Sequence, residues 1–302
     1  MAPTLRRLLA AEQRAFLRRD RRAWEAHLGR VRTFLGEGLA GADPGRPVLI
    51  LGAGPGLEVP WDQAPRDTWG WDADPWSRLR TALRHRRWPP WVFDDLTGGL
   101  DALAAAAQRC VRQPWAKGQP RPRERALARL EGLLPSLPVD GRGLEAWITE
   151  HRPGLILSAN VLGQLGVVAQ RLLQGILGPW PCLEDPEAED PFAEALDAWI
   201  ARAVAAHLAR LAASGAALRL VYDRGVVHGG ADLALGEWAE PWPEQILGKG
   251  RAEVEDPLCG VDPLAVLASA GRPALRRERW LWPVAPGQTH LVEAVATGPG
   301  TM

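Results

Sequence analysis

The chain of 302 residues contains little cysteine and carries no net charge. Its 3 cysteines, Cys110, Cys182 and Cys259, lie far apart and form no C-x-x-C pair. This set argues against a disulfide framework and a structural zinc site, and it suits a reducing, cytoplasmic environment. With 36 basic and 36 acidic side chains, the chain has no overall attraction for nucleic acids or anionic membranes.

The sequence also lacks a long apolar run. Arg14, Arg18 and Arg19 follow the basic N-terminus so closely that we expect no signal peptide. No uninterrupted apolar stretch approaches the roughly 20 residues of a membrane-spanning helix, so no membrane segment is expected. Tyrosine and phenylalanine are scarce, with 1 and 4 residues, against 15 tryptophans. Most of these tryptophans are expected in the core because of their large apolar area.

A short apolar strand followed by glycines is the clearest motif. Residues 47–51 are typical of a buried strand, and Gly52, Gly54 and Gly56 follow it, with a helix expected after the turn. Glycine lets a ligand approach the backbone more closely than a Cβ atom allows. Leu57 stands where the dinucleotide fingerprint G-x-G-x-x-G has its third glycine, which disfavours a nicotinamide dehydrogenase.

Acidic residues follow the next two predicted strands. Asp72 ends the second strand, where a carboxylate is placed to accept hydrogen bonds from ribose hydroxyls. Asp74 precedes Pro75 and is expected to cap the helix that begins there. Asp94 and Asp95 follow the third strand, either as ligand-binding acids or as turn residues.

Strand-like and helix-like segments alternate along most of the chain. They predict an N-terminal helical extension at residues 1–45 and one α/β domain at residues 46–298, with inserts at about 112–150 and 229–275. The predicted strands are 47–51, 68–72, 91–93, 154–157, 217–223, 277–284 and 290–296. The predicted helices are 4–36, 75–86, 100–111, 124–133, one that follows the loop beginning at residue 158 and runs to about 176, and 191–213. The order indicates a doubly wound, mostly parallel, seven-stranded sheet with a C-terminal antiparallel hairpin.

Polar residues follow the fourth and fifth predicted strands. Ser158 and Asn160 follow the fourth, and a buried amide such as Asn160 must find a partner in the backbone or in a ligand. Asp223 and His228 follow the fifth, where either is placed to accept a proton from a reacting group. For His228 the alternative is an exposed loop histidine. His290, in a closing strand, is expected to be structural or to make a contact between strands.

With these motifs the chain resembles the class I S-adenosylmethionine-dependent methyltransferases over residues 46–298. The resemblance implies that the loop of Gly52, Gly54 and Gly56 cradles the methionine part of the cofactor. It also implies that Asp72 binds the ribose hydroxyls, and that Asp95, with Asp94 as the alternative, reaches the adenine amino group.

Two further positions bear on the resemblance. Residues 158–165 are similar to an S-x-N-x-L-x-Q-L stretch of a bacterial subgroup, and they fall where the family flanks the reactive methyl group, so Ser158 and Asn160 are expected beside the cofactor. Ile50 stands where members often have an acid that holds the cofactor's amino group. Glu58 is the expected substitute, and a helix-start role is the alternative for it.

The resemblance implies S-adenosylmethionine-dependent methyl transfer to a small molecule or a peptide, without a metal. Asn160, Asp223 and His228 are the catalytic candidates, and a homodimer is left open. Ile50 favours one alternative, a non-catalytic binding or scaffold protein on the same frame. Another alternative, RNA methylation through the arginines at 109–125, is disfavoured by the neutral charge and the lack of RNA-binding motifs.

Overall fold

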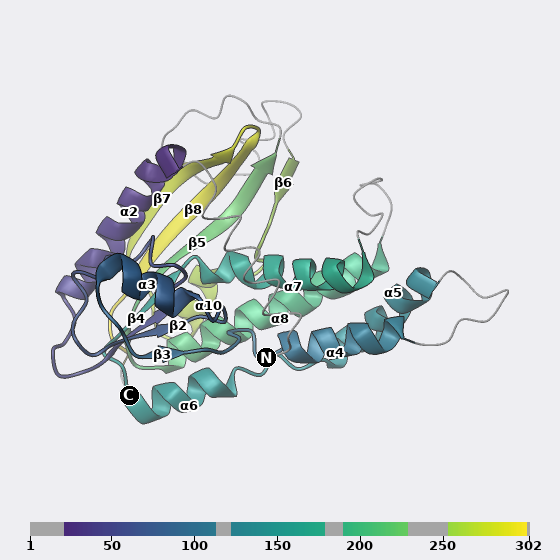
Figure 1. Cartoon of the computed structure of the whole chain (residues 1–302), viewed down its shortest axis with the longest axis horizontal. Helices are drawn as coiled ribbons and strands as arrows, with labels where there is room; N and C mark the ends of the chain where they lie inside the picture. Colours follow the sequence, from purple (N-terminus) through teal and green to yellow (C-terminus); the bar gives the residue numbers. More distant parts are fainter. Residues whose placement is uncertain (1–20, 113–121, 179–189, 229–252, 301–302) are drawn as a thin grey trace.

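The computed structural model describes residues 21–112, 122–178, 190–228 and 253–300 (Figure 1). The predicted leading helix lies outside the described residues as far as residue 20, and Cys182 also lies outside them. No helix in the described part of the chain is long and apolar enough to cross a membrane.

Within the described residues an eight-stranded sheet has the order β3-β2-β1-β4-β5-β8-β7. The remaining strand, β6, pairs with the C-terminal end of β5. Neighbouring strands from β3 to β5 are parallel, whereas β8 is antiparallel to both β5 and β7. The doubly wound sheet with a C-terminal antiparallel hairpin is thereby confirmed, with β6 as an additional short strand. The strand bounds are Val48–Leu51 for β1, Thr68–Trp71 for β2, Trp91–Val92 for β3, Leu155–Ala159 for β4, Ala217–His228 for β5, Glu253–Glu255 for β6, Ala274–Ala285 for β7 and Gln288–Thr297 for β8.

Two helical layers bury the central strands from both sides. Every residue of β1 and β4 is buried, as expected of parallel strands covered on both faces. One face packs against α4 (Leu100–Val111), α5 (Pro122–Leu133), α6 (Arg142–His151), α7 (Val161–Leu177) and α8 (Pro191–Ala213). Figure 1 shows α4, α5, α7 and α8 gathered on this side.

The N-terminal helix α2 (Arg21–Ala40) builds the core of the other face. Its apolar side packs onto β1, β4, β7 and β8 through Trp24, Leu28, Val31, Phe34, Leu35 and Leu39. Trp24 also meets Trp282 of β7 edge to face, with ring centroids 4.9 Å apart. The helix that the sequence predicts as an extension therefore forms one of the two layers that cover the sheet.

The link between β1 and β2 departs from the prediction. Residues 52–67, all of them described, form turns and bends rather than the expected helix. Proline removes a backbone donor and clashes with the preceding turn of a helix, and Pro55, Pro60 and Pro65 recur too closely for a helix to form between them.

Several element boundaries also differ from the prediction. Helix α3 (Ser77–His85) begins after Trp76, so Pro75 does not occupy its first position. Strands β4 and β5 run to Ala159 and His228, beyond their predicted ends. The second insert, described from residue 253 onwards, contains β6 and the short helix α10 (Pro263–Ser269).

Candidate functional site

A cleft of about 1020 Å³ lies at the carboxyl ends of the parallel strands. Ligands of doubly wound sheets bind at this edge, where the loops after each strand converge. The structure brings most of the predicted site residues to its wall, namely Gly52, Gly54, Glu58, Asp72, Asp95, Asn160, Asp223 and His228. Gly56 and Ser158 are not among the lining residues.

The three glycines after β1 all have left-handed backbone conformations, but the surroundings of their Cα atoms differ. Gly52, Gly54 and Gly56 have φ of +63°, +50° and +69°, a region that L side chains rarely adopt. A Cβ atom on Gly52 would lie 2.4 Å from the Val161 side chain, whereas one on Gly54 would meet nothing nearer than 3.7 Å. Gly52 is thus required by packing, and Gly54 leaves space open at the cleft.

Gly56 serves the contact between the loop and α3. The His85 Nε2 atom lies 2.9 Å from the Gly56 carbonyl oxygen. A Cβ atom on Gly56 would come within 3.0 Å of the Thr81 hydroxyl. This glycine therefore fixes the back of the loop against the helix and faces away from the cleft.

Asp72 joins the glycine loop to the end of β2. Its carboxylate accepts hydrogen bonds from the backbone N–H of Gly54 at 2.8 Å and from that of Asp74 at 2.7 Å. Burial raises the pKa of Asp72 to about 6, against the lowering effect of these two bonds. The Ser77 side chain also hydrogen-bonds to this carboxylate. A carboxylate offers about four lone-pair positions, so room for a further hydroxyl donor remains.

Asp74 stabilises the start of α3 without occupying the helix cap. Its carboxylate accepts a hydrogen bond from the backbone N–H of Trp76 at 3.1 Å and pairs with Arg80 at 2.8 Å. The prediction that Asp74 caps the helix is therefore wrong, because α3 begins after Trp76, two residues beyond Asp74. The ribose role of Asp72 stays a prediction.

Asp95 holds the turn that begins α4. Its carboxylate accepts hydrogen bonds from the backbone N–H groups of Thr97, Gly99 and Leu100, at 2.9, 3.1 and 2.8 Å. Burial raises the pKa of Asp95. Asp94 also lines the cleft and is exposed. Of the two acids, Asp94 is therefore the one whose carboxylate is more accessible to a ligand.

Glu58 is linked to the N-terminal helix rather than to a helix start, since no helix begins after the glycine loop. Its carboxylate lies 3.7 Å from Nε2 of the buried His27. The Trp280 indole donates a hydrogen bond to His27 Nδ1 at 3.1 Å, which assigns the ring proton to Nε2, facing Glu58. His27 also stacks on Trp282 at 3.7 Å between ring centroids.

The segment between β4 and α7 presents only one of its two predicted site residues. Ser158 lies within β4 and is fully buried, so it does not belong to the loop after that strand. Asn160 directly precedes α7 with a φ of +53°, and its backbone N–H donates to the Val221 carbonyl at 2.8 Å. Asn160 lines the cleft, and its side-chain oxygen is buried without a hydrogen-bond partner.

Asp223 and His228 lie within β5, not in a loop after it, because this strand extends along the antiparallel hairpin. Asp223 is 3% exposed, and its Oδ2 lies 3.0 Å from Nδ1 of His290 on β8. His228 is at the rim, where its Nε2 lies 3.3 Å from a carboxylate oxygen of Glu255. The pairing brings to the cleft a residue that the sequence predicted as structural, His290.

The hydrogen bonds of His290 assign its tautomer. Its Nε2 lies 3.2 Å from the side-chain nitrogen of Gln288, so the amide donates and Nε2 accepts. The ring proton is then on Nδ1, facing Asp223. The Nδ1 atom lies 3.0 Å from the Asp223 carboxylate but makes no hydrogen bond to it, so the carboxylate lies beside the ring without fixing its orientation. The opposite nitrogen, Nε2, can act as a base once the Gln288 amide moves away from it.

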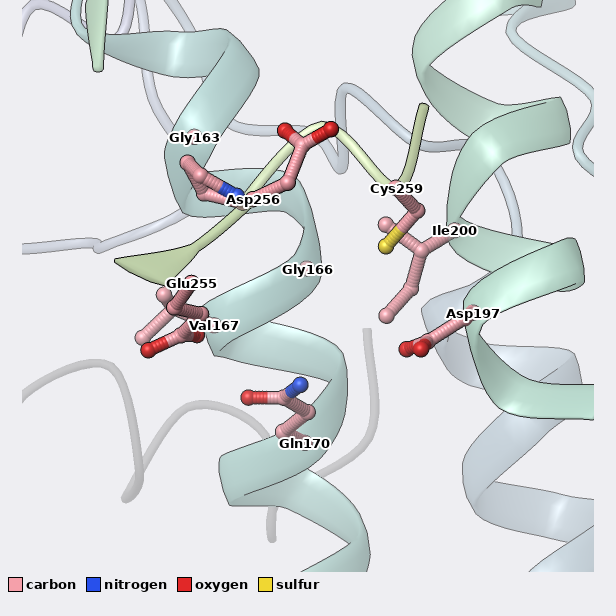
Figure 2. A pocket seen from close by; sticks show the side chains of 10 residues that line it. Gly163, Gly166, Val167, Gln170, Asp197, Ile200, Glu255, Asp256 and Cys259 are labelled. Atoms are coloured by element: carbon pink, nitrogen blue, oxygen red, sulfur yellow. The ribbon is translucent and has the colours of Figure 1, made fainter. Parts of the chain in front are cut away.

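A side cavity of about 270 Å³ opens next to the cleft (Figure 2). Asp197 of α8 lies near Cys259, whereas the Asp256 carboxylate points away from it and accepts hydrogen bonds from the backbone N–H groups of Leu258 and Gly260. The residues that line both spaces are Gly163, Val167, Gln170, Glu255 and Pro257. Burial and the neighbouring carboxylates raise the pKa of the Cys259 thiol far above its usual range. The thiol therefore stays protonated and is no nucleophile.

Among the described residues, no group of three or more His, Cys, Asp or Glu is arranged to hold a metal ion.

Solved structures resemble the chain, but the sequence comparisons found no match. No protein-family model and no curated protein sequence matches it. The 1,6-didemethyltoxoflavin-N1-methyltransferase of Burkholderia thailandensis, solved with 1,6-didemethyltoxoflavin and S-adenosylhomocysteine, is 14% identical with a TM-score of 0.40, over 99% of this chain and 91% of that one. DesVI of Streptomyces venezuelae is 11% identical with a TM-score of 0.35, over 92% of both chains.

Proposed function

We propose that the cleft binds S-adenosylmethionine and directs methyl transfer to a small molecule or a peptide. The observation that carries this proposal is the hydrogen bond between Asp72 and the Gly54 backbone at the wall of the cleft. It places a carboxylate at the end of β2 beside a glycine loop at the end of β1. An adenosyl ligand needs this pair of features, one for its ribose hydroxyls and one for close approach to the backbone.

The donors and acceptors of the cleft fit this cofactor. S-adenosylmethionine carries positive charge on its sulfonium and amino groups, and the wall beside the glycine loop carries Glu58, Asp72 and Asp94. Gly54 leaves room where a side chain would otherwise project. The side-chain oxygen of Asn160, buried without a partner, is an acceptor that a ligand can satisfy.

Each residue then has a simple task. Asp72 accepts hydrogen bonds from the ribose hydroxyls, and Asp94 accepts one from the adenine amino group. Glu58 faces the amino group of the methionine part, because Ile50 stands where similar proteins often have an acid for this role. When bound, the cofactor supplies a methyl group that its sulfonium already activates. The protein therefore needs to align the acceptor and exclude water, which requires few catalytic side chains.

Calorimetric titration with S-adenosylhomocysteine tests the proposal. We expect binding by the full chain and a loss of about a hundredfold in affinity for Asp72→Ala, because two hydrogen bonds to a charged acceptor disappear. Asp62→Ala, which removes an exposed acid from the same β1–β2 link, is the matched control and should bind like the unmodified chain. Unchanged affinity in a folded Asp72→Ala variant would contradict the ribose assignment.

A scaffold without catalysis is the second candidate, and the environment of Ile50 favours it. This side chain is fully buried in the core between β1 and α2, so the strand offers no acid to the cofactor's amino group. Native mass spectrometry of the purified chain distinguishes the versions of this candidate. Retained S-adenosylmethionine would contradict an empty scaffold, and methylated product after addition of an acceptor would contradict any scaffold.

A further inference from the structure

We propose that the methyl acceptor is a cationic amine, held by Asn160 and Asp223 and deprotonated by His290. This inference rests on the proposed function and names the substrate class of the same cleft. It arises from the charges of the wall, from two buried oxygens without partners and from the orientation of one histidine.

The wall is strongly acidic in a chain that is neutral overall. Within the described residues, 7 carboxylates and a single arginine, Arg171, line the cleft; the carboxylates are Glu58, Asp72, Asp74, Asp94, Asp95, Asp223 and Glu255. Asp223 and Glu255 lie on β5 and β6, apart from the β1–β3 strand ends to which the cofactor is assigned. A cleft lined by one sign of charge concentrates ligands of the opposite sign. An anionic acceptor is therefore disfavoured, and a cation is favoured.

Two buried oxygen atoms specify what kind of cation fits. Asn160 and Asp223 line the cleft with 9% and 3% of their surface exposed, and the Oδ1 atom of each is buried without a hydrogen-bond partner. A buried acceptor left unsatisfied costs about 1–3 kcal/mol, so a ligand with hydrogen-bond donors gains by meeting both. An ammonium group supplies several N–H donors and a positive charge, whereas a quaternary cation supplies none.

His290 completes the site as the group that takes the proton. Its Nδ1–H faces Asp223, and its Nε2 is an acceptor that the Gln288 amide now occupies. An ammonium N–H that replaces this amide donates to the same nitrogen. A primary ammonium gives one proton to Nε2, and the freed lone pair forms the N–C bond to the methyl carbon. The C–S bond breaks with its electron pair kept by sulfur, the product is the N-methylated ammonium, and His290 passes its proton to water.

An oxygen nucleophile fits the same residues less well. Deprotonation of a phenol or an alcohol would leave an anion beside Asp223, which burial already isolates from water. Deprotonation of an ammonium instead leaves a neutral amine, with no new negative charge among the carboxylates. The electrostatics of the wall therefore select nitrogen over oxygen.

The experiment uses the full chain saturated with S-adenosylhomocysteine, whose own titration is measured first. Two matched sets of probes differ only in the polar group: tryptamine, tryptophol and indole-3-acetate, and phenethylamine, 2-phenylethanol and phenylacetate. Ligand-observed NMR measures their binding. We expect each amine to bind at least about tenfold more tightly than its alcohol and its acid, and Asp223→Asn to abolish this preference. Glu150→Gln, on an exposed position of α6, should retain it.

The outcomes separate the two proposals. Absence of S-adenosylhomocysteine binding overturns the proposed function and this inference with it. Cofactor binding without an amine preference, or with a preference unchanged by Asp223→Asn, overturns the inference alone.

The role of His290 has its own readout. For an amine that is methylated, His290→Gln should lower the rate about a hundredfold at neutral pH and leave cofactor affinity unchanged. The deficit should shrink as the pH rises, because the amine then loses its proton to the solvent. A purely structural histidine would give a deficit that does not depend on pH, and that result overturns the assignment.

Discussion

The two ends of the cleft are built in different ways. At the cofactor end, the glycine loop after β1 and Asp72 at the end of β2 lie 16 to 20 residues apart in the chain, and the Asp72 carboxylate accepts backbone hydrogen bonds from Gly54 and Asp74. At the acceptor end, Asp223 and His290 meet only because β5 and β8 pair antiparallel over their whole length. The first end follows from local chain geometry, and the second depends on the register of two distant strands.

Two buried carboxylates of the antiparallel hairpin region, Asp223 and Glu293, have different roles. Asp223 faces the cleft and keeps an oxygen without a partner. Glu293 of β8, opposite Tyr222, is 1% exposed and fully engaged, and it does not line the cleft. Tyr222 and Asp223 are neighbours in β5, so their side chains point to opposite faces of the sheet, and Glu293 lies on the Tyr222 face. Asp223 is therefore available for binding, and Glu293 holds the hairpin together.

The largest predicted effect tests that division. The Glu293 carboxylate accepts a hydrogen bond from the Tyr222 hydroxyl at 2.5 Å and pairs with Arg277 and with Arg279, the latter at 2.9 Å. Glu293→Gln removes the charge that two arginines share, so the free energy of unfolding should fall by about 3 kcal/mol. Denaturant unfolding measures this loss, while S-adenosylhomocysteine affinity should not change in the folded variant. Asp223→Asn is the matched comparison, since it should affect amine binding more than stability.

The second prediction separates packing from ligand space in the glycine loop. Gly52→Ala adds a Cβ atom 2.4 Å from Val161 at a positive φ, so it should cost about 2–3 kcal/mol of stability. Gly54→Ala has the same kind of backbone strain without the clash and should cost about 1 kcal/mol, yet weaken cofactor binding. Thermal unfolding and calorimetry on both variants measure the two effects. Equal destabilisation with unchanged affinity for Gly54→Ala would contradict its assignment to the cleft.

The sequence predicted the cofactor end better because its signals are short in range. A buried apolar run, the glycines after it and an acid at the next strand end are all visible as spacing, and the sheet order then follows from alternation. His290 carried no such signal, since its partner Asp223 is fixed by the register of the hairpin. The continuation of β5 to His228 also depends on pairing with distant strands, β6 and β8, so the local sequence does not indicate it.

Two local features of the sequence explain the structure around the cofactor end. Pro55, Pro60 and Pro65 exclude the helix that was expected after the glycine loop. Asp95 precedes Thr97 and Gly99, whose N–H groups it accepts, a pattern typical of a turn acid that holds a helix start. Both signals lie within a few residues of the structure that they determine, so they do not depend on strand register.

The third prediction concerns pH and tests whether the cofactor end works through an ionised Asp72. Its pKa of about 6 lies above the ordinary value of 3.8, because burial disfavours the charge. Between these two pH values the folded chain binds more protons than the unfolded chain, so this group's contribution to stability falls as the pH rises from about 4 to about 6. Cofactor affinity should move in the opposite direction, since only the ionised carboxylate accepts both ribose hydroxyls.

For a group with a pKa of about 6, only about a tenth is ionised at pH 5, so the affinity for S-adenosylhomocysteine should fall about tenfold between pH 7.5 and pH 5. Calorimetry at stepped pH measures this slope. In Asp72→Asn the affinity should be weaker throughout, and this pH dependence should vanish, because the titrating group is gone. A slope that persists in Asp72→Asn would assign the titration to another acid of the wall. The ribose would then lie elsewhere, and the two ends of the cleft would have to be reassigned.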